Sequence, residues 1–338
     1  MIRTCLSLLI AAVACTLSFN SIAQIPMKFP QSLHQGDTIA LISPASSQRT
    51  ETIDSAIAVL RTWGLEAECM PHAKGRNFGS YPATDEERLS DLVEAFSNPK
   101  YKAILCTRGG YGCNHLIEHV DRRIISNNPK WLIGYSDISA LHALMRSAGV
   151  ASIHGPMTSH IANEPDSDQS IVYMKQILFD GLPVEYHADP APYDHFGKAT
   201  GRLAGGNLMV LNGLSGTKFD MLDAGKDEPV ILFIEDISEK IYAIERVLIR
   251  LHLSGVLDRV DGIIVGQFTD YKHDDNFSSM ESMIYTWLRR WGYYDKKDFP
   301  IVFNFPVGHV TKNYPMVEGA MSTLTVNHDG ATLLMEAE

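Results

Sequence analysis

Ser136 stands where a short apolar stretch gives way to an amphipathic one, in the run Trp131-Leu-Ile-Gly-Tyr-Ser-Asp-Ile-Ser-Ala. The pattern predicts a buried strand followed directly by a helix. A serine at such a turn is exposed at the carboxyl edge of the sheet, and the N–H of Asp137 could bind a developing oxyanion. These residues predict a serine nucleophile. Ile138 replaces the last glycine of the usual GxSxG pattern, and a plain helix N-cap is the competing interpretation.

A second candidate is the glycine turn Arg108-Gly-Gly-Tyr-Gly, which follows a predicted strand. Glycine lets backbone N–H groups approach a ligand closely. The turn has neither the GxGxxG nor the GxxxxGK[ST] spacing of nucleotide-binding loops. Gly110 therefore suits a second oxyanion donor beside a serine nucleophile, and a tight turn without a ligand is the alternative.

Two carboxylates, Glu235 and Asp236, end another predicted strand. Side chains alternate along a strand, so Glu235 shares a face with Ile231 and Phe233. Asp236 stands three residues before Glu239, which predicts a helix N-cap in a capping box. We therefore assign the catalytic carboxylate to Glu235. The alternative is that both carboxylates serve only the positive end of the helix dipole.

His309 follows a predicted buried strand and a Pro-Val-Gly turn, the position of a functional loop residue. A general base needs a pKa near the working pH and a carboxylate that fixes its tautomer, and Glu235 would supply that carboxylate. His154, in Ile-His-Gly-Pro-Met, is the rival. In a chain with thirteen histidines, the residues by themselves do not choose between the two.

The elements that must position these residues alternate from Asp37 onward between β-branched runs and amphipathic stretches, the pattern of a parallel sheet covered by helices. One helix opens with a capping box of Thr84 and Glu87. The predicted strands cover residues 38–43, 65–70, 102–106, 131–134, 151–154, 230–235, 262–267 and 301–305. The predicted helices cover residues 50–63, 84–97, 113–120, 139–148, 172–179, 238–253 and 280–291. A glycine-rich turn is expected at residues 201–206 and a terminal hairpin with its turn at Asp329-Gly330.

The length of 338 residues exceeds the size at which one hydrophobic core usually stops growing, so two domains are expected. Periodicity fades and Pro, Asp, His and Gly accumulate before residue 200, which predicts an interdomain linker over residues 166–200. We place a domain that carries the nucleophile at residues 24–165. A second domain, with the catalytic Glu and His, covers residues 201–338.

The first residues have the pattern of a secretory signal peptide, with one early arginine, an apolar run and small residues before a cleavage site at Ala23-Gln24. A membrane anchor would need about 20 apolar residues, more than this run contains. A lipoprotein signal with Cys15 as the lipidated residue is the other alternative. No later segment is apolar over such a length, so after loss of residues 1–23 we expect an exported, periplasmic chain without a transmembrane segment.

Charge and cysteine content exclude several functions. The formal net charge is −11, and removing the leader with its one arginine makes it −12 (−11 − 1). Without a basic block, nucleic-acid binding is not expected. Cys69, Cys106 and Cys113 remain after the leader, an odd number in which Cys106 with Cys113 is the one candidate bridge. Neither a CxxC pair nor an HExxH helix is present, and no metal site is expected.

Taken together, the motifs resemble those of the LD-carboxypeptidase family of serine peptidases, which also contains the microcin C immunity amidases. The resemblance spans nearly the whole mature chain. The motifs are Leu41-Ile-Ser-Pro-Ala-Ser-Ser, Thr107-Arg-Gly-Gly-Tyr-Gly, Ile133-Gly-Tyr-Ser-Asp-Ile-Ser-Ala-Leu, Ile153-His-Gly-Pro-Met, Gly205-Gly-Asn-Leu, Phe233-Ile-Glu-Asp and Pro306-Val-Gly-His. The resemblance implies an α/β fold with a Rossmann-like N-terminal domain, a smaller β-rich, barrel-like C-terminal domain, and a homodimer with the site between domains.

The family's functional residues carry over motif by motif. The nucleophile is Ser136, the carboxylate is Glu235 and the histidine is His309, which the resemblance prefers over His154. The oxyanion hole uses the backbone N–H groups of Gly110 and Asp137. No metal or cofactor is implied.

The implied reaction is hydrolysis of the bond between meso-diaminopimelate and a terminal D-alanine in murein tetrapeptides. Many family members are cytoplasmic, whereas the leader predicts that this chain works where intact murein lies. A microcin-type aminoacyl-nucleotide amidase and a non-catalytic periplasmic binding protein are the alternatives. Arg108 is a candidate for binding the substrate carboxylate, and an interdomain or dimer salt bridge is its alternative role.

Overall fold

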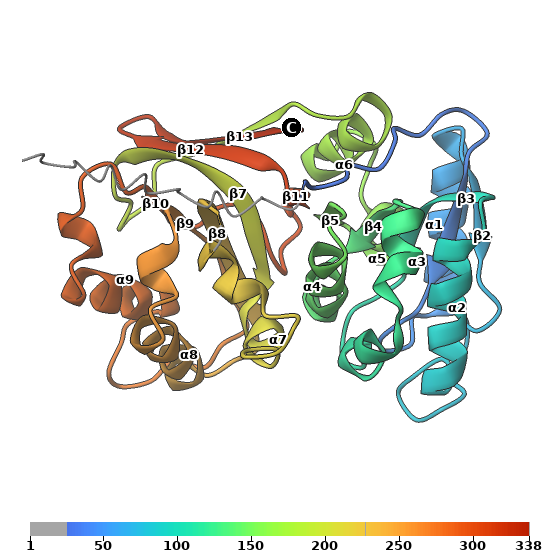
Figure 1. Ribbon diagram of the computed structural model, residues 1–338, viewed down its shortest axis with the longest axis horizontal. Helices are drawn as coiled ribbons and strands as arrows, with labels where there is room; N and C mark the ends of the chain where they lie inside the picture. The colour runs from blue at the N-terminus through green and yellow to red at the C-terminus, as the bar shows by residue number, and fades with distance from the viewer. Residues whose placement is uncertain (1–25, 227, 338) are drawn as a thin grey trace, which may run out of the picture.

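The computed structural model describes residues 26–226 and 228–337, which form two β-sheets side by side with helices packed around them (Figure 1). The predicted leader at residues 1–23, including Cys15, lies outside the described residues. In the described part of the chain, no helix has both the length and the apolar character needed to cross a membrane.

The first sheet has six strands in the order β11, β5, β4, β3, β1, β2, and all except β11 run parallel. The strands are β1 (Thr38–Ile42), β2 (Glu66–Cys69), β3 (Tyr101–Cys106), β4 (Trp131–Gly134), β5 (Ser152–His154) and β11 (Met316–Glu318). Strands β1 and β4 are buried along their whole length, because helices cover both faces of the sheet. The predicted parallel sheet is confirmed.

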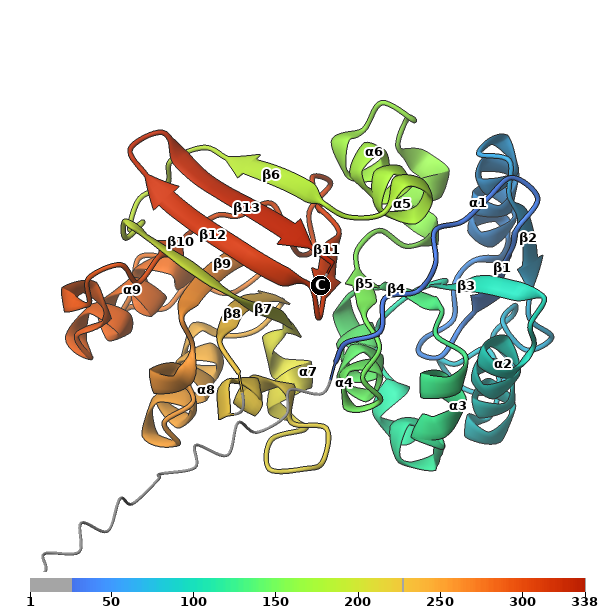
Figure 2. The ribbon, with the colours of Figure 1, turned by 45° about the horizontal axis from the view of Figure 1, so that its top comes forward.

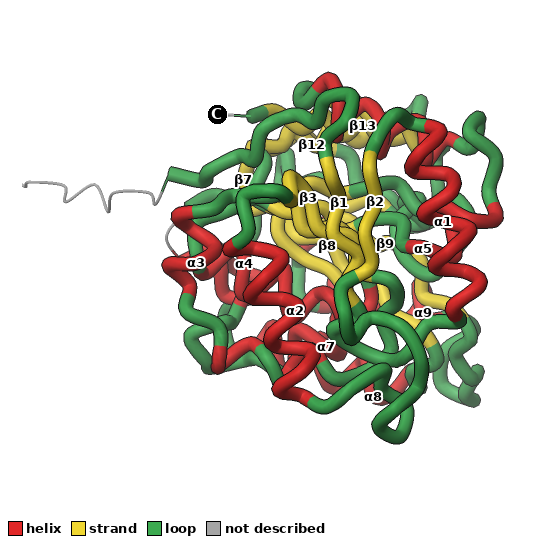
Figure 3. The backbone as a smooth tube through the Cα atoms, turned by 90° about the vertical axis from the view of Figure 1, so that its right-hand side faces the viewer, coloured by secondary structure: helices red, strands yellow, loops and turns green. Residues whose placement is uncertain are grey.

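Helices cover this sheet on both sides, with α1 and α5 on one face and α2, α3 and α4 on the other (Figure 3). These helices and the one that follows them are α1 (Thr50–Thr62), α2 (Asp85–Ser97), α3 (Arg122–Asn127), α4 (Ser139–Ser147), α5 (Thr158–Asn163) and α6 (Gln169–Lys175). The predicted capping box of Thr84 and Glu87 opens α2. Residues 113–120, predicted as one helix, instead form two 3₁₀ turns, η1 (Cys113–His115) and η2 (Ile117–His119). So short a segment is not a stable helix by itself, and its tertiary contacts decide its conformation.

The second sheet has seven strands in the order β10, β9, β8, β7, β12, β13, β6. Neighbours from β10 to β7 run parallel, and neighbours from β7 to β6 run antiparallel. The strands are β6 (Val184–Ala188), β7 (Gly197–Asn207), β8 (Val230–Ile237), β9 (Gly262–Thr269), β10 (Ile301–Val302), β12 (Met321–Asn327) and β13 (Gly330–Glu336). The helical segments of this part are α7 (Leu208–Asn212), η5 (Met221–Lys226), α8 (Ile241–Leu253), η6 (Leu257–Arg259), α9 (Met280–Arg290) and η7 (Tyr293–Asp295). The C-terminal part is therefore β-rich, as predicted.

The predicted glycine turn at residues 201–206 is wrong, because these residues lie inside β7, in the middle of the second sheet. A Cβ on Gly201 would lie 2.7 Å from the Val230 nitrogen, and one on Gly205 would lie 1.9 Å from the Phe233 oxygen. The glycines thus permit close contact between neighbouring strands rather than a reversal of the chain.

Residues 166–200, predicted as a linker, contain ordered elements. They include α6, the π-helical turn η4 (Gln176–Asp180) and β6, which pairs with β13 in the second sheet. Strand β11 belongs to the C-terminal part of the sequence but pairs with β5 in the first sheet (Figure 2). The chain therefore crosses between the sheets more than once, and the proposed domain limits stay a prediction.

The terminal hairpin is formed by β12 and β13, as predicted. Asn327 lies opposite Gly330, so the turn consists of His328 and Asp329, one residue earlier than expected. Cys106 and Cys113 are both buried and unbridged, so the candidate disulfide is not formed.

Candidate active site

Ser136 lies at an abrupt turn between β4 and α4. Strand β4 ends at Gly134, Tyr135 is still extended, and the 3₁₀ turn η3 (Ser136–Ile138) leads into α4. The backbone of Ser136 has a φ of 67°, the left-handed region that non-glycine residues rarely adopt. This is the geometry of a nucleophile elbow, which presents the side chain beyond the carboxyl end of the strand.

Two glycines make room for this turn. A Cβ on Gly109 would lie 2.7 Å from the Cβ and 2.9 Å from the Oγ of Ser136, and a Cβ on Gly134 would lie 2.9 Å from Cγ1 of Ile138. Ile138 is fully buried. The glycine that the usual motif has after the serine is absent here, and the space for the bulky Ile138 comes from Gly134 before it.

Glu235 and His309 form a hydrogen-bonded pair from two neighbouring segments of the C-terminal part. Glu235, near the end of β8, is fully buried, and its Oε2 accepts from Nδ1 of His309 at 2.8 Å. Gly308 permits the approach, because its φ is 125° and a Cβ there would lie 3.0 Å from the same oxygen. With its Nδ1 proton held by Glu235, the neutral His309 ring keeps a lone pair on Nε2.

The electrostatics of this pair favour a charged imidazole. Burial lowers the pKa of His309, but the hydrogen bond and the negative charge of Glu235 outweigh burial and raise the pKa above its ordinary value. Next in the chain, burial and the neighbouring Glu235 raise the pKa of Asp236 to about 7. A proton on His309 is thus stabilised by the carboxylates behind it.

One pocket of about 440 Å³ joins these residues. It is lined by Gln48, Thr107, Arg108, Gly109, Gly110, Tyr135, Ser136, Met157, Ser159, His160, Ile237 and His309. The structure therefore brings Ser136 from the first sheet and His309 from the C-terminal part to one cavity, with Glu235 behind the histidine. No hydrogen bond joins Ser136 to His309 within residues 26–226 and 228–337.

The glycine turn and the serine elbow are held together by buried contacts. The Asp137 carboxylate accepts from the Cys113 N–H at 2.8 Å, and burial raises the pKa of this acid. Gly110, with a φ of 107°, lines the pocket, and a Cβ there would lie 2.4 Å from Oγ of Ser46. The backbone N–H groups of Gly110 and Asp137 as oxyanion donors stay a prediction.

Asp236 does not have its predicted role as the N-cap of the following helix. That helix, α8, begins at Ile241 after Lys240, and Asp236 lies inside β8. Its carboxylate instead accepts from Nδ2 of Asn207 at 3.1 Å and from the Met209 N–H at 2.8 Å, at the start of α7. The Asp236 carboxylate therefore contacts the start of α7, which is close in space, and not the start of α8, which follows it in the sequence.

His154, the rival histidine, lies outside the pocket. Its ring is fully buried, with Tyr135 at 6.0 Å and Phe233 at 5.2 Å between ring centroids. Burial lowers the pKa of His154 well below its ordinary value. A neutral ring enclosed in the core cannot accept a proton from Ser136.

Arg108 lines the pocket with an exposed side chain, and its Nη1 donates to the Ser47 carbonyl at 3.1 Å. Among the described residues its contact is this hydrogen bond and not an ion pair, so an interdomain salt bridge is not seen, and the alternative of a dimer salt bridge stays a prediction. Its contact with a substrate carboxylate stays a prediction.

Sequence reasoning assigned no role to Gln48, Met157 and Ser159, which also line the pocket. Gln48 donates to Oγ of Ser159 at 2.8 Å, which links the segments after β1 and β5. Ligands of open α/β sheets bind beyond the carboxyl ends of the strands. Applied to residues 43–48 and 155–160, this rule would have found all three.

Comparisons with known proteins place this chain in a family. The model of the LD-carboxypeptidase N-terminal domain matches residues 39–155, and that of the LD-carboxypeptidase C-terminal domain matches residues 200–324. The chain belongs to the LD-carboxypeptidase family, a family of peptidases, and its fold is that of this family.

Individual relatives cover nearly the whole chain. A probable murein peptide carboxypeptidase of Bacillus subtilis (strain 168) is 32% identical over 310 residues, 90% of this chain and 93% of the relative. The murein tetrapeptide carboxypeptidase of Pseudomonas aeruginosa (strain PAO1) is 30% identical over 304 residues, 86% of this chain and 93% of the relative. The crystal structure of an MccF-like protein from Bacillus anthracis str. Ames has a TM-score of 0.78 at 26% identity, covering 92% of this chain and 100% of that chain.

Proposed function

We propose that this protein is a serine carboxypeptidase that hydrolyses the amide bond between meso-diaminopimelate and the terminal D-alanine of murein tetrapeptides. One observation carries the proposal: Ser136, on a strained elbow, lines the same pocket as His309, whose Nδ1 is bonded to the buried Glu235. The relatives named as murein peptide carboxypeptidases support the substrate class.

In the proposed mechanism, Nε2 of His309 takes the proton of Ser136 while Oγ attacks the carbonyl carbon of the scissile bond. The oxyanion accepts from the backbone N–H groups of Gly110 and Asp137. His309 then protonates the amine of D-alanine, which leaves. Water, deprotonated by the same histidine, hydrolyses the acyl-enzyme. Glu235 keeps the proton on Nδ1 throughout and stabilises the imidazolium.

The test uses a murein tetrapeptide and mass spectrometry of the products. The wild-type protein should release tripeptide and free D-alanine, and Ser136→Ala should release neither. Ser147→Ala, at the C-terminal end of the following helix α4, is the matched control and should match the wild type. Absence of release by the wild type, or undiminished release by Ser136→Ala, would refute the proposal.

An aminoacyl-nucleotide amidase is the second candidate, because the MccF-like structure from Bacillus anthracis superposes over nearly the whole chain. Parallel assays with an aminoacyl sulfamoyl adenosine and a murein tetrapeptide distinguish the two activities. Labelling of Ser136 by a fluorophosphonate separates both from a non-catalytic binding protein.

We also propose that the protein works in the periplasm as a homodimer. The leader pattern at residues 1–23 supports export, and the resemblance to the family supports the dimer. Fractionation of cells that express the protein with or without residues 2–23 tests whether it is exported to the periplasm. Light scattering coupled to gel filtration tests whether it is a homodimer, and a monomer at micromolar concentration would contradict the dimer.

A further inference from the structure

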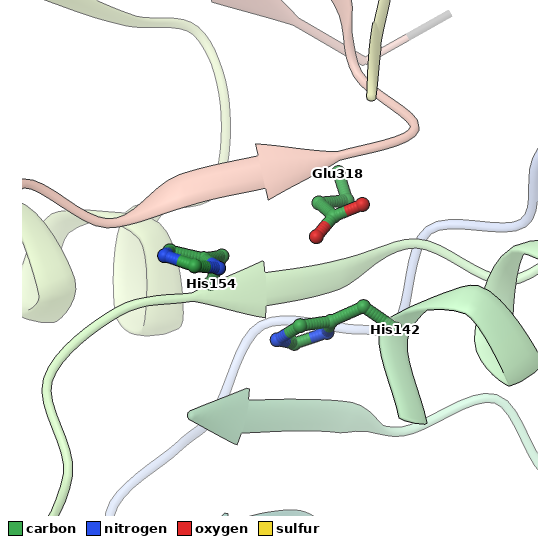
Figure 4. A group of neighbouring side chains, drawn as sticks. All are labelled: His142, His154 and Glu318. Atoms are coloured by element: carbon green, nitrogen blue, oxygen red, sulfur yellow. The ribbon is translucent and has the colours of Figure 1, made fainter. Parts of the chain in front are cut away.

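A cluster of three buried side chains lies between the two sheets, outside the pocket. His142 comes from α4, His154 from β5 and Glu318 from β11 (Figure 4). Among the described residues, it is the one group of at least three histidine, cysteine and carboxylate side chains in which one ligand atom from each lies within 4.8 Å of the others. Figure 4 shows the carboxylate of Glu318 turned toward the two imidazole rings.

Two members of this cluster lack hydrogen-bond partners. Neither ring nitrogen of His154 has a partner among the described residues, and neither carboxylate oxygen of Glu318 makes a hydrogen bond of normal geometry there. The Gly205 amide and the Arg146 guanidinium favour the charged form of Glu318, but burial outweighs both. Buried polar atoms are nearly always satisfied in folded proteins, so four such atoms in one place point to a ligand.

His142 is already oriented as a metal-ligating histidine would be. Its Nε2 lies 2.8 Å from the carbonyl oxygen of Gly134 and must therefore carry the proton, which leaves the lone pair on Nδ1. Metal-bound histidines commonly donate their second N–H to a backbone carbonyl in this way. Nδ1 accepts from the hydroxyl of Ser152 at 2.8 Å, so that hydroxyl lies beside the cluster.

The surroundings suit a cation with nitrogen and oxygen ligands. Both imidazoles are fully buried, and the neutral imidazole is the form that binds metals. Glu318 is buried, and Arg146, whose charge acts on it, is paired with Glu228. A divalent ion would supply the missing charge.

We propose that His142, His154 and Glu318 bind a divalent transition-metal ion, with zinc as the best match to two imidazoles and one carboxylate. Tetrahedral zinc needs ligand atoms roughly 3.4 Å apart, so small side-chain rotations would close the site. The hydroxyl of Ser152 or a water takes the fourth position.

The role of this ion is structural. It ties β11, which the C-terminal part contributes to the first sheet, to α4 and β5. Through the packing of His154 on Tyr135 and Phe233, it supports the wall between Ser136 and Glu235 without entering the pocket.

The first experiment measures metal content and binding in the wild-type mature chain. Protein purified without chelators and dialysed against zinc should contain about one zinc ion per chain by mass spectrometry. At a hundredfold excess over Kd, zinc should raise the Tm by about 5 °C. Cobalt in place of zinc should give the visible absorption of a tetrahedral site. A folded wild-type chain that binds no zinc, with no change in Tm, would overturn the proposal.

The second experiment compares variants. Glu318→Gln keeps the shape of the side chain and removes its charge, and it should weaken zinc binding at least a hundredfold, as should His154→Gln. His72→Gln is the matched control, because His72 also contacts a carboxylate, Asp91, but lies outside the cluster; its zinc affinity should not change. A zinc affinity of Glu318→Gln equal to that of the wild type would refute the assignment of Glu318 as a ligand. If neither site variant folds, the wild-type titration decides.

Discussion

The backbone of Ser136 is strained at the residue where chemistry is proposed. Its φ of 67° costs an L-residue roughly 1–2 kcal/mol relative to an ordinary conformation. Strain of this kind persists only where surrounding contacts impose it, and it clusters at functional sites. Here the buried Asp137 and Ile138 on one side and the closely packed Gly109 on the other hold the turn in place.

Substitutions at Ser136 should separate strain from catalysis. Ser136→Gly should be more stable than Ser136→Ala by about 1 kcal/mol in free energy of unfolding, because glycine adopts a positive φ without a Cβ clash. Both variants should lack carboxypeptidase activity. Urea denaturation and the tetrapeptide assay measure the two effects, and an alanine variant at least as stable as the glycine variant would show that the elbow is not strained.

The pH profile should report the pair of His309 and Glu235. The neutral imidazole is the proposed base, so kcat/KM should fall as the pH decreases through the pKa of His309, which lies above its ordinary value. Glu235→Gln removes the charge that raises this pKa. The acid limb of the kcat/KM profile should therefore move to lower pH in this variant. Its kcat should drop about 10⁴-fold, as when the carboxylate of other serine triads is replaced.

Asp236→Asn is the internal comparison for this profile. The charge of Asp236 also raises the pKa of His309, but less than Glu235 does. The acid limb of the kcat/KM profile of Asp236→Asn should therefore move to lower pH, by a smaller amount than in Glu235→Gln. An unchanged limb in Glu235→Gln would mean that His309 is not the titrating base.

At the scale of elements, the site depends on how closely the glycine turn after β3 approaches the elbow after β4. Strands β3 and β4 are parallel neighbours, so their carboxyl ends lie at one edge of the sheet. The hydrogen bond from the Cys113 N–H to Asp137 connects the segment after β3 to the segment after β4. Gly109 has no space for a side chain beside Ser136.

Gly109→Ala should therefore impair catalysis by moving the nucleophile. A Cβ 2.7 Å from the Cβ of Ser136 forces one of the two segments to shift, and a loss of at least tenfold in kcat is expected. Gly213→Ala is the control, since Gly213 has a φ of −64° and its nearest neighbour to a new Cβ is at 3.2 Å. Equal kcat values for the two variants would contradict the proposed crowding.

At the scale of the molecule, the two sheets share their hydrophobic cores. One core contains Leu132 of β4 and Leu232 of β8, and the other contains Ile133 of β4 and Phe233 of β8. Strand β11 adds a backbone connection, because it belongs to the C-terminal part and pairs with β5. The first sheet is therefore incomplete without the C-terminal part of the chain.

Unfolding should therefore be a single cooperative transition. Calorimetry of the mature chain should give one peak whose van't Hoff and calorimetric enthalpies agree, because loss of either sheet exposes the core of the other. Far-UV and near-UV circular dichroism should follow the same curve. Two separate transitions, one for each sheet, would show that the shared core does not couple them.

The sequence by itself determined the features that depend on neighbours along the chain. Apolar runs located the strands from β1 to β5, and the pair Thr84 and Glu87 located the start of α2, because burial pattern and capping chemistry are local. Side-chain alternation also preferred Glu235 over Asp236 as the partner of a catalytic histidine, and the structure shows the hydrogen bond from His309 to Glu235.

Only the tertiary structure decided features that depend on contacts between distant residues. From the residues alone, His309 and His154 were equal candidates, and burial separates them. Asp236 serves α7 rather than α8, and the cluster around Glu318 exists only because β11 returns to the first sheet. A hydrogen bond or a metal site requires atoms within a few ångströms, and chain folding, not sequence separation, sets that distance.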